Sequence, residues 1–168
     1  EPLTLADLRG KVVIVDFWTY SCINCVRTLP YITDWNTKYA DDGLVILGVH
    51  TPEFEFEKDL KNVMDAVERF GIEYPVVQDN DFTTWRAFNN RYWPAKYFID
   101  AQGNVRYTHF GEGKYEESEL VIKQLLAEIG VDNNEALTAV VQKNYSSDQT
   151  PETYVGFGRH ETFHSPED

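Results

Sequence analysis

Two kinds of hydrophobic pattern alternate along most of this chain. Continuous apolar runs occupy residues 12–18 and 44–49, and such runs are typical of strands that are buried on both faces. Elsewhere apolar side chains recur every three or four positions, and this spacing predicts helices at about 22–39, 55–70 and 116–129. The pattern therefore predicts strands that alternate with helices.

Shorter elements complete this pattern in the second half of the chain. Residues 74–77 are predicted to form a strand and residues 82–89 a short helix. Segments 96–100 and 105–110 are predicted to pair as a hairpin, because the glycine-containing turn 101–104 separates them. The resulting order, β-α-β-α-β-α-β-β-α, is typical of an α/β fold with a central mixed sheet, helices on both faces and an antiparallel edge.

The two ends of the chain differ from this regular part. Residues 1–130 hold all the predicted elements, with a turn at Gly10-Lys11 in an N-terminal extension of the first strand. Residues 131–168 contain seven acidic and two basic residues without strong periodicity, which predicts an irregular acidic tail or linker. The chain begins at Glu1 without an initiator Met. We therefore expect a processed form or a fragment, with any anchor or export signal upstream.

The charge of the chain excludes some classes of partner. Its 168 residues carry 15 basic and 28 acidic side chains, which gives a net charge of −13. This balance disfavours nucleic acids and anionic membrane surfaces, because both bind through clustered Lys and Arg. No segment approaches the ~20 consecutive apolar residues that cross a bilayer, and no signal-peptide pattern is present. The acidity is best explained as a solvated surface.

The only two cysteines stand together as Cys22-Ile23-Asn24-Cys25, where the first predicted strand gives way to a helix. At a helix start, unpaired backbone N–H groups and the helix dipole stabilise a thiolate, so the pKa of Cys22 should fall to roughly 3.5–7.5. Cys25 follows three residues later on the same helix face, within reach of Cys22. We expect Cys25 to be more buried and to remain a thiol longer.

This arrangement predicts thiol–disulfide exchange in two steps. The Cys22 thiolate attacks a partner disulfide and forms a mixed disulfide, and Cys25 then attacks the sulfur of Cys22 and releases the reduced partner. Two other interpretations are a pair of cysteines that merely packs and half of a zinc site. The spacing at a helix start argues against the first, and the scatter of the four histidines argues against the second. We expect no metal, and no cofactor beyond the redox-active Cys22–Cys25 disulfide.

The dithiol and four further features resemble the thioredoxin superfamily. Pro30 stands where that fold carries a helix-kinking proline, and Trp93-Pro94 stands where it carries a cis-proline opposite the dithiol. Phe17-Trp18 and the opening segment 5–13 are similar to the TlpA/ResA-like branch of the superfamily. The resemblance covers residues 1–130 and implies a thioredoxin fold.

Longer stretches resemble the C-terminal region of DipZ-like proteins. They are residues 17–25, 48–54 and 150–154. The resemblance implies a CcdA/DsbD-like membrane domain before this region, which passes electrons outward, and a β-sandwich, carbohydrate-module-like domain after the tail. The present chain contains neither domain. The resemblance further implies an extracytoplasmic, membrane-tethered oxidoreductase related to cytochrome c biogenesis, with disulfide-bearing proteins as substrates.

The resemblance also implies roles for individual residues. A cis Pro94 would present the backbone of Trp93 to a substrate strand, and the Trp93 side chain would shield the dithiol, contact a partner or simply pack. Glu53 is the candidate proton acceptor for Cys25, although its position also suits the start of a helix. Asp16, on the strand beneath the dithiol, is the rival candidate for that role. The remaining substrate-binding candidates are Trp18 and Tyr20.

Three classes of function are consistent with these features. The leading hypothesis is a thiol–disulfide oxidoreductase that works as a reductase of protein disulfides. The second is a thiol peroxidase, because Thr19 and Cys22 have the Thr-x-x-Cys spacing of peroxiredoxins, although position 15 lacks their usual proline. The third is a protein- or glycan-binding module in which the dithiol is secondary, since many Trp and Tyr residues are present.

Overall fold

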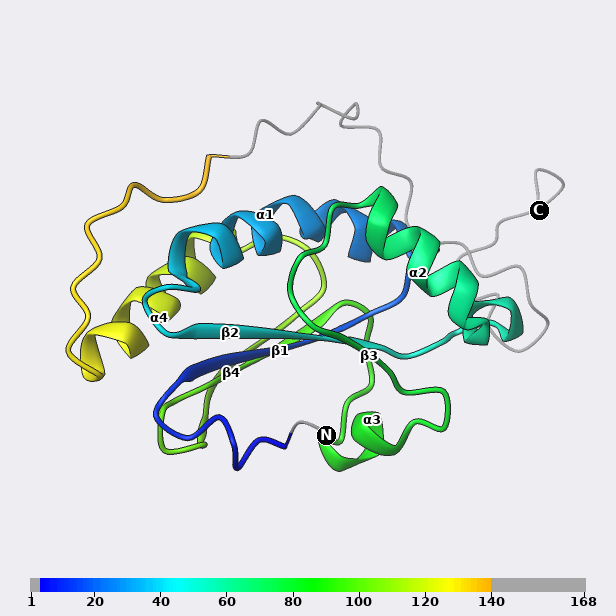
Figure 1. Ribbon diagram of the computed structural model, residues 1–168, viewed down its shortest axis with the longest axis horizontal. Coiled ribbons are helices and arrows are strands. Elements are labelled where there is room, and N and C mark those ends of the chain that lie inside the picture. Colours follow the sequence, from blue (N-terminus) through cyan, green and yellow to red (C-terminus); the bar gives the residue numbers. More distant parts are fainter. Residues whose placement is uncertain (1–3, 140–168) are drawn as a thin grey trace, which may run out of the picture.

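The computed structural model describes residues 4–139, which form one five-stranded sheet with helices around it (Figure 1). The strands are β1 (Val12–Trp18), β2 (Leu44–His50), β3 (Val76–Gln78), β4 (Ala95–Ile99) and β5 (Val105–Phe110). The helices are α1 (Ile23–Tyr39), the 3-10 helix η1 (Glu55–Lys58), α2 (Leu60–Arg69), α3 (Thr83–Ala87) and α4 (Tyr115–Glu128). The strand order is β3-β2-β1-β4-β5, so the first strand of the sequence lies at the centre of the sheet.

The sheet is mixed, as the sequence predicts. β1 pairs in parallel with β2, and β2 pairs in parallel with β3. On its other side β1 pairs antiparallel with β4, which continues through the hairpin to β5. The two parallel pairs use helical crossovers, whereas the hairpin needs only a short turn. The α/β thioredoxin-like architecture predicted from the sequence is therefore confirmed.

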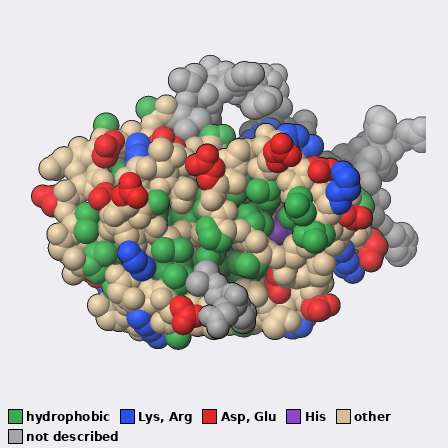
Figure 2. Space-filling model, viewed as in Figure 1, with side chains coloured by type: hydrophobic (Ala, Val, Ile, Leu, Met, Phe, Trp, Pro, Cys, Tyr) green, Lys and Arg blue, Asp and Glu red, His purple; other side chains and the backbone are tan. Residues whose placement is uncertain are grey.

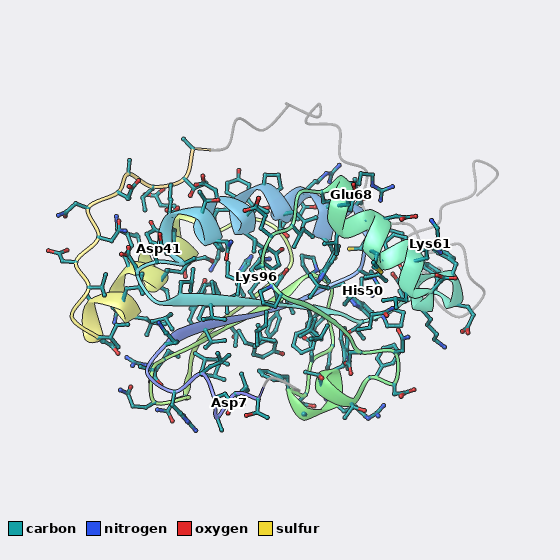
Figure 3. The ribbon with its side chains drawn as sticks, in the orientation of Figure 1. Asp7, Asp41, His50, Lys61, Glu68 and Lys96 are labelled. Atoms are coloured by element: carbon teal, nitrogen blue, oxygen red, sulfur yellow. The ribbon has the colours of Figure 1, made fainter. Side chains whose placement is uncertain are left out.

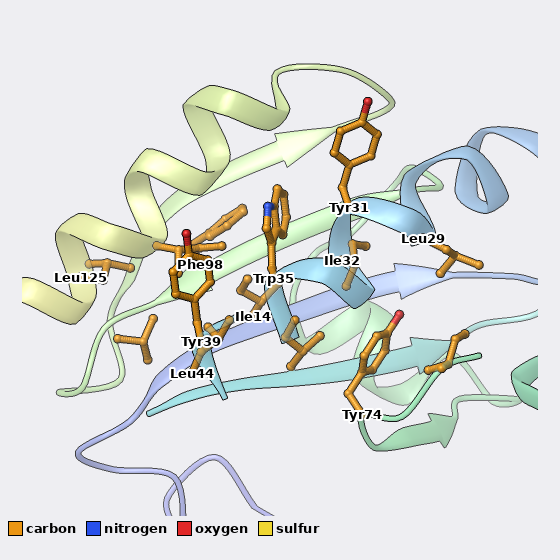
Figure 4. Packing of buried hydrophobic residues seen from close by; sticks show 14 of the residues in the cluster. Ile14, Leu29, Tyr31, Ile32, Trp35, Tyr39, Leu44, Tyr74, Phe98 and Leu125 are labelled. Atoms are coloured by element: carbon orange, nitrogen blue, oxygen red, sulfur yellow. The ribbon is translucent and has the colours of Figure 1, made fainter. Parts of the chain in front are cut away.

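The central strand β1 is buried on both faces and separates two hydrophobic clusters. Alternate side chains of a strand point to opposite faces, so Ile14 and Trp18 pack beneath α1 and α4 while Val15 and Phe17 face α3. In Figure 1, α1 and α4 lie above the sheet and α3 lies below it. Figure 4 shows the larger cluster, which includes Ile32, Trp35 and Tyr39 of α1 with Phe98 of β4 and Leu125 of α4. Each such fully buried side chain contributes about 1.5–3 kcal/mol.

The predicted helix at 55–70 is wrong in one respect, because the structure divides it into η1 and α2. Asp59 stands between them with an extended backbone, and its carboxylate accepts hydrogen bonds from the backbone N–H groups of Lys61 and Asn62. This is the geometry of a helix N-cap, in which a side chain satisfies N–H groups that lack partners inside the helix. Asp59 therefore starts a new helix inside a segment whose apolar spacing predicts a single helix.

The described part of the predicted tail runs along α1 and α4. The backbone N–H of Thr138 donates to the carboxylate of Glu119 at 2.7 Å, and the Thr138 hydroxyl donates to Asp34 at 2.6 Å. Residues 131–139 are thus held by side chains from two helices. The remainder of the predicted tail, including the DipZ-like stretch 150–154, lies outside the described residues.

Candidate active site

The two cysteines occupy the first turn of α1, directly after the central strand. Cys22 is the N-cap residue of α1, and its sulfur accepts a hydrogen bond from the backbone N–H of Cys25 at 3.2 Å. Cys22 is partly exposed, whereas Cys25 is completely buried, and both are free thiols in this structure. The helix start therefore holds one accessible and one inaccessible sulfur side by side.

The surroundings of Cys22 favour its thiolate. A hydrogen bond from the Cys25 thiol is the main cause that lowers the pKa of Cys22, and backbone N–H groups of Cys25 and Asn24 lower it further. Partial burial and the negative charge of Glu53 oppose this effect. The pKa of Cys22 consequently lies below that of an ordinary cysteine, which makes Cys22 the better nucleophile near neutral pH.

The surroundings of Cys25 have the opposite effect. Burial is the main cause that raises its pKa well above the ordinary value, followed by the hydrogen bond to Cys22 and the negative charges of Cys22 and Asp16. Cys25 therefore holds its proton more strongly than Cys22 does. A base is needed before Cys25 can attack a disulfide.

A buried ion pair lies in the sheet beneath the dithiol. The Asp16 carboxylate of β1 and the Lys96 ammonium of β4 are 3.8 Å apart, and both side chains are completely buried. Neither group makes a hydrogen bond within the part of the chain that the structure describes. Burial raises the pKa of Asp16 to about 6, although Lys96 opposes this, and burial lowers the pKa of Lys96. Figure 3 shows Lys96 between α1 and the sheet.

The sequence analysis identified Asp16 as a candidate but missed Lys96. The β1–β4 pairing places these two residues directly opposite each other, and nothing local in the sequence predicts this register. A signal was nevertheless present, because Lys96 is the single basic residue in a strand that is otherwise apolar until Asp100. A charge in such a strand points to a buried partner, since lysine is almost never fully buried unpaired.

Glu53 lies on the exposed loop after β2, where its charge raises the pKa of Cys22. The buried carboxylate of this region is Glu57 in η1, which the sequence analysis missed. It accepts hydrogen bonds from the Ser21 hydroxyl at 2.5 Å and from the backbone N–H groups of Glu53 and Phe54 at 2.6 and 2.9 Å. These bonds keep the pKa of Glu57 low despite its burial. Glu57 thus ties this loop to the residue that precedes Cys22.

A neutral histidine supports the strand end before the dithiol. His50, at the end of β2, is completely buried, and its Nε2 lies 3.3 Å from the Thr19 hydroxyl. Trp18 contacts the His50 ring edge-on, and Tyr20 stacks on it. Burial lowers the pKa of His50 to about 4, so the ring is uncharged near neutral pH. Figure 3 shows His50 on the side of the sheet nearer to α2.

The structure gives the aromatic candidates different surroundings. Trp18 is completely buried and contacts the His50 ring edge-on, and its contact with substrates stays a prediction. Tyr20 is partly exposed, and its hydroxyl donates to the backbone carbonyl of Phe56 at 3.1 Å. Trp93 is also partly exposed, and its indole N–H donates to the carbonyl of Thr51 at 3.0 Å.

Pro94 connects this region to the hairpin. The Trp93–Pro94 peptide bond is cis, and the carbonyl of Pro94, a buried residue, accepts a hydrogen bond from the backbone N–H of Gly111 at 2.8 Å.

Three apolar side chains near the dithiol in sequence or contact are about half exposed, namely Ile23, Phe54 and Phe56. Figure 2 shows that hydrophobic side chains gather across the middle of one face, with charged side chains around them.

Residues 4–139 contain no group of three or more His, Cys, Asp or Glu side chains that is arranged to hold a metal ion. Within the same range, every helix is too short or too polar to cross a membrane.

Comparison with known proteins agrees with this geometry. Residues 1–108 match the model of the AhpC/TSA family. The chain is 47% identical to protein DipZ of Mycobacterium bovis over 95% of its length, but it spans only 23% of that protein. It is 30% identical to the thiol-disulfide oxidoreductase YkuV of Bacillus subtilis, covering 75% of this chain and 85% of YkuV.

A solved structure shows the same fold. The exposed lipoprotein thioredoxin Etrx1 of Streptococcus pneumoniae superposes with a TM-score of 0.60 at 27% identity. The superposition covers 72% of this chain and 90% of Etrx1. The chain thus shares its fold with a named thioredoxin.

Proposed function

We propose that this chain reduces disulfides of extracytoplasmic proteins through Cys22 and Cys25. The premise is that the chain belongs to the AhpC/TSA family and is a thiol–disulfide oxidoreductase. The observation that carries this proposal is the asymmetry of the two sulfurs. Cys22 is accessible and has a lowered pKa, while Cys25 is buried and has a raised pKa. Such a pair attacks with one sulfur and resolves with the other.

In the first step, the Cys22 thiolate attacks one sulfur of the substrate disulfide. A bond forms between this sulfur and Cys22, the substrate S–S bond breaks, and the other substrate sulfur leaves as a thiolate. The hydrogen bond from Cys25 N–H to the Cys22 sulfur holds the nucleophile at the helix start. The half-exposed Ile23, Phe54 and Phe56 offer apolar contact to the polypeptide around the disulfide.

In the second step, Asp16 serves as the base for Cys25. The Asp16 carboxylate accepts the Cys25 proton, and the resulting Cys25 thiolate attacks the Cys22 sulfur and releases the second substrate thiolate. The protein dithiol is oxidised to a disulfide and the substrate disulfide is reduced to two thiols. A pKa of about 6 leaves Asp16 ionised at neutral pH while keeping it a usable base.

We assign this role to Asp16 rather than to Glu53. Asp16 is completely buried beneath the dithiol, and its charge raises the pKa of Cys25. Glu53 is exposed, and its charge raises the pKa of Cys22 instead. A base that is shielded from water and faces the resolving sulfur fits the second step better.

The location and the electron donor are inferred from the relatives. Etrx1 is named an exposed lipoprotein thioredoxin, which supports an extracytoplasmic location. DipZ is about four times as long as the matched segment, and the DipZ-like resemblance implies a membrane domain of CcdA/DsbD type as electron donor. In this proposal that donor restores the dithiol after each turnover. The surface that donor and substrate both use is bordered by Trp93, Pro94 and Tyr20.

Trapping of substrates tests the proposal. Cys25→Ser should accumulate mixed disulfides between Cys22 and extracytoplasmic proteins, because the second step is blocked. Non-reducing electrophoresis of the tagged variant should show adducts that a reductant dissolves. The matched control, Cys22→Ser, retains the buried sulfur and should form none. Equal adduct formation by both variants, or none by Cys25→Ser, would contradict the proposal.

A thiol peroxidase has less support from the geometry. In that alternative the Thr19 hydroxyl would help to hold peroxide at Cys22. The hydroxyl is instead buried against His50, 3.3 Å from its Nε2. The buried Cys25, three residues from Cys22 on the same helix, also suits the resolution of a mixed disulfide.

A further inference from the structure

A row of ionisable side chains crosses three strands of the sheet beneath the dithiol. Asp16 of β1 pairs with Lys96 of β4, and Lys96 pairs in turn with His109 of β5. Residues that pair directly across antiparallel strands point to the same face with Cβ atoms about 4.5–5.5 Å apart. The three side chains therefore lie next to one another on the face that α1 and α4 cover.

The last member of the row reaches the edge of the sheet. β5 is an edge strand, and His109 is its only buried residue, since the other five are exposed or partly exposed. The His109 side chain is nevertheless 9% exposed, and its Nε2 lies 3.2 Å from the backbone carbonyl of Glu112 in the loop before α4. The row thus begins at the completely buried Asp16 and ends at His109, which is slightly exposed on the edge strand.

We propose that Lys96 and His109 form the route by which the proton taken from Cys25 leaves Asp16 for solvent. The inference rests on the proposed function, because it assigns the fate of the proton in the second step. The route ends at β5, the edge strand of the sheet. Lys96 and His109 are positioning residues, since neither touches the reacting sulfurs.

The proton balance closes without a further reactant. After the second step Asp16 is a neutral carboxylic acid, Lys96 an ammonium and His109 an uncharged imidazole. Lys96 donates a proton to His109, takes the proton of Asp16, and His109 releases its proton to water. Asp16 and Lys96 then regain their original charges, and one proton has reached solvent.

The protonation tendencies along the row agree with this direction. Burial lowers the pKa of Lys96. Burial and the positive charge of Lys96 lower the pKa of His109. A lysine and a histidine with lowered pKa values pass a proton on more readily than ordinary ones. No hydrogen bond within residues 4–139 holds the Lys96 ammonium to a fixed acceptor.

Other charges face the row from the neighbouring elements. The charges of both cysteines on α1 and of Glu112 raise the pKa of Lys96. Glu112 is also paired with Arg27 of α1 at 3.4 Å. Near His109, Lys114 lowers and Glu117 raises the pKa of the imidazole. Tyr74 contributes a buried hydroxyl near Asp16. Burial is the main cause that raises the pKa of this tyrosine, and the charge of Asp16 raises it further.

A single-turnover reaction separates the two exchange steps. Reduced protein is mixed with the neutral disulfide 4,4′-dithiodipyridine, and each step releases one thiopyridone that absorbs in the near ultraviolet. The first release reports attack by Cys22, and the second reports attack by Cys25. His109→Ala should slow the second release about tenfold at neutral pH, as expected when a proton-transfer group is lost. The first release should be unchanged.

Chemical rescue distinguishes a proton route from a packing role. Added imidazole should restore the second release in His109→Ala, because it supplies the missing base at the sheet edge. The matched control is Thr108→Ala, at an exposed neighbouring position of β5, which should resemble wild type with and without imidazole. An unchanged second release in His109→Ala, or a slow one that imidazole does not restore, would overturn the proposal.

Lys96→Met tests the middle of the row. Loss of the ammonium should shift the midpoint of the pH profile of the second release upward by about 1–3 units, because Asp16 loses its compensating charge. Lys96→Arg keeps the charge and serves as a second variant if the first does not fold. NMR titration of His109 gives a readout that is independent of catalysis. The pKa of His109 should rise in Lys96→Met, because the positive charge of Lys96 lowers it in the wild type. An unchanged pKa would contradict the proximity of the two side chains.

The outcomes separate this inference from the proposed function. If Asp16→Asn slows the second release and His109→Ala does not, the route is wrong and Asp16 remains the base. If Asp16→Asn leaves the second release unchanged, the assignment of the base fails. If Cys25→Ser still releases both thiopyridones, the two-step mechanism itself fails.

Discussion

Two buried carboxylates at opposite ends of α1 have opposite properties. Asp16 lies below the first turn of this helix, makes no hydrogen bond among residues 4–139, and has a pKa raised to about 6. Glu119 of α4 lies beside the last turn, where it accepts hydrogen bonds from the Tyr39 hydroxyl and the Thr138 N–H, each at 2.7 Å. The pKa of Glu119 is lowered although its side chain is 1% exposed. Burial alone therefore does not decide the pKa.

Hydrogen bonds account for the difference. Burial raises the pKa of both carboxylates, but donors that bind the charged form lower it again. Glu57 shows that distance from the sulfurs is not the cause, since it lies beside the dithiol segment and its three hydrogen bonds still keep its pKa low. A carboxylate without donors is left as a base, whereas one with donors becomes a structural anchor.

The largest expected effect is on the rate of the second exchange step. Asp16→Asn should slow the release of the second thiopyridone roughly 100-fold at neutral pH, because a general base typically contributes at least that much. Glu119→Gln, the matched change at the other buried carboxylate, should leave the rate unchanged. Stopped-flow absorbance measures both. A similar loss in the two variants would show that the contrast between base and anchor is mistaken.

The next effect is on how stability depends on pH. The folded pKa of Asp16, about 6, lies above its ordinary value of 3.8, so the folded state binds the extra proton. The resulting stabilisation is complete below about pH 4 and is lost as the pH rises to about 6, which amounts to roughly 3 kcal/mol. Relative to wild type, Asp16→Asn should therefore gain stability over this range.

Glu119 should give the opposite slope. Its folded pKa is lowered from 4.5, so its contribution is present above that value and is lost as the pH falls through the folded pKa. Glu119→Gln should abolish this loss of stability at acidic pH. It should also lower the free energy of unfolding by about 1–3 kcal/mol at neutral pH. Urea titrations across the pH range measure both variants against wild type, which cancels the contribution of His50, a group that also titrates near pH 4. Equal slopes for the two variants would contradict the comparison.

The smallest effect concerns the segment that helps to anchor Glu119. Thr138→Val removes the hydroxyl that donates to Asp34 but keeps the backbone N–H that donates to Glu119. It should lower the free energy of unfolding by about 1 kcal/mol and leave both exchange steps unchanged. The same urea and stopped-flow measurements apply. A change in the exchange rate would mean that the end of α1 distant from the dithiol influences the sulfurs.

The elements of the fold were predictable because their signals are local. Apolar runs, helical spacing and the glycine turn depend on neighbours within a few residues, and they predicted the mixed sheet and its hairpin. The error at Asp59 has a local cause as well, since a polar N-cap that starts a second helix resembles a surface position of one long helix. Only the side-chain capping bonds separate the two.

The candidate site was predictable in part. The sequence by itself determined that two cysteines stand at a strand–helix junction, with Cys22 at the N-cap and Cys25 one turn into the helix, because both facts follow from contiguous residues. It also placed Asp16 beneath them as one of two candidate bases. It favoured Glu53 over Asp16 as the base, since burial depends on what covers each residue and local sequence does not show this.

Only the tertiary structure decided the rest. Lys96 and His109 come from strands about 80 and 93 positions after Asp16, and their alignment depends on the register between strands that are far apart in sequence. The same holds for Glu119, which is joined to Tyr39 and Thr138 across the chain. Local sequence specifies which groups a strand or helix carries. Packing specifies which of them lose water and which find a partner, and that difference separates the proposed base from the anchor.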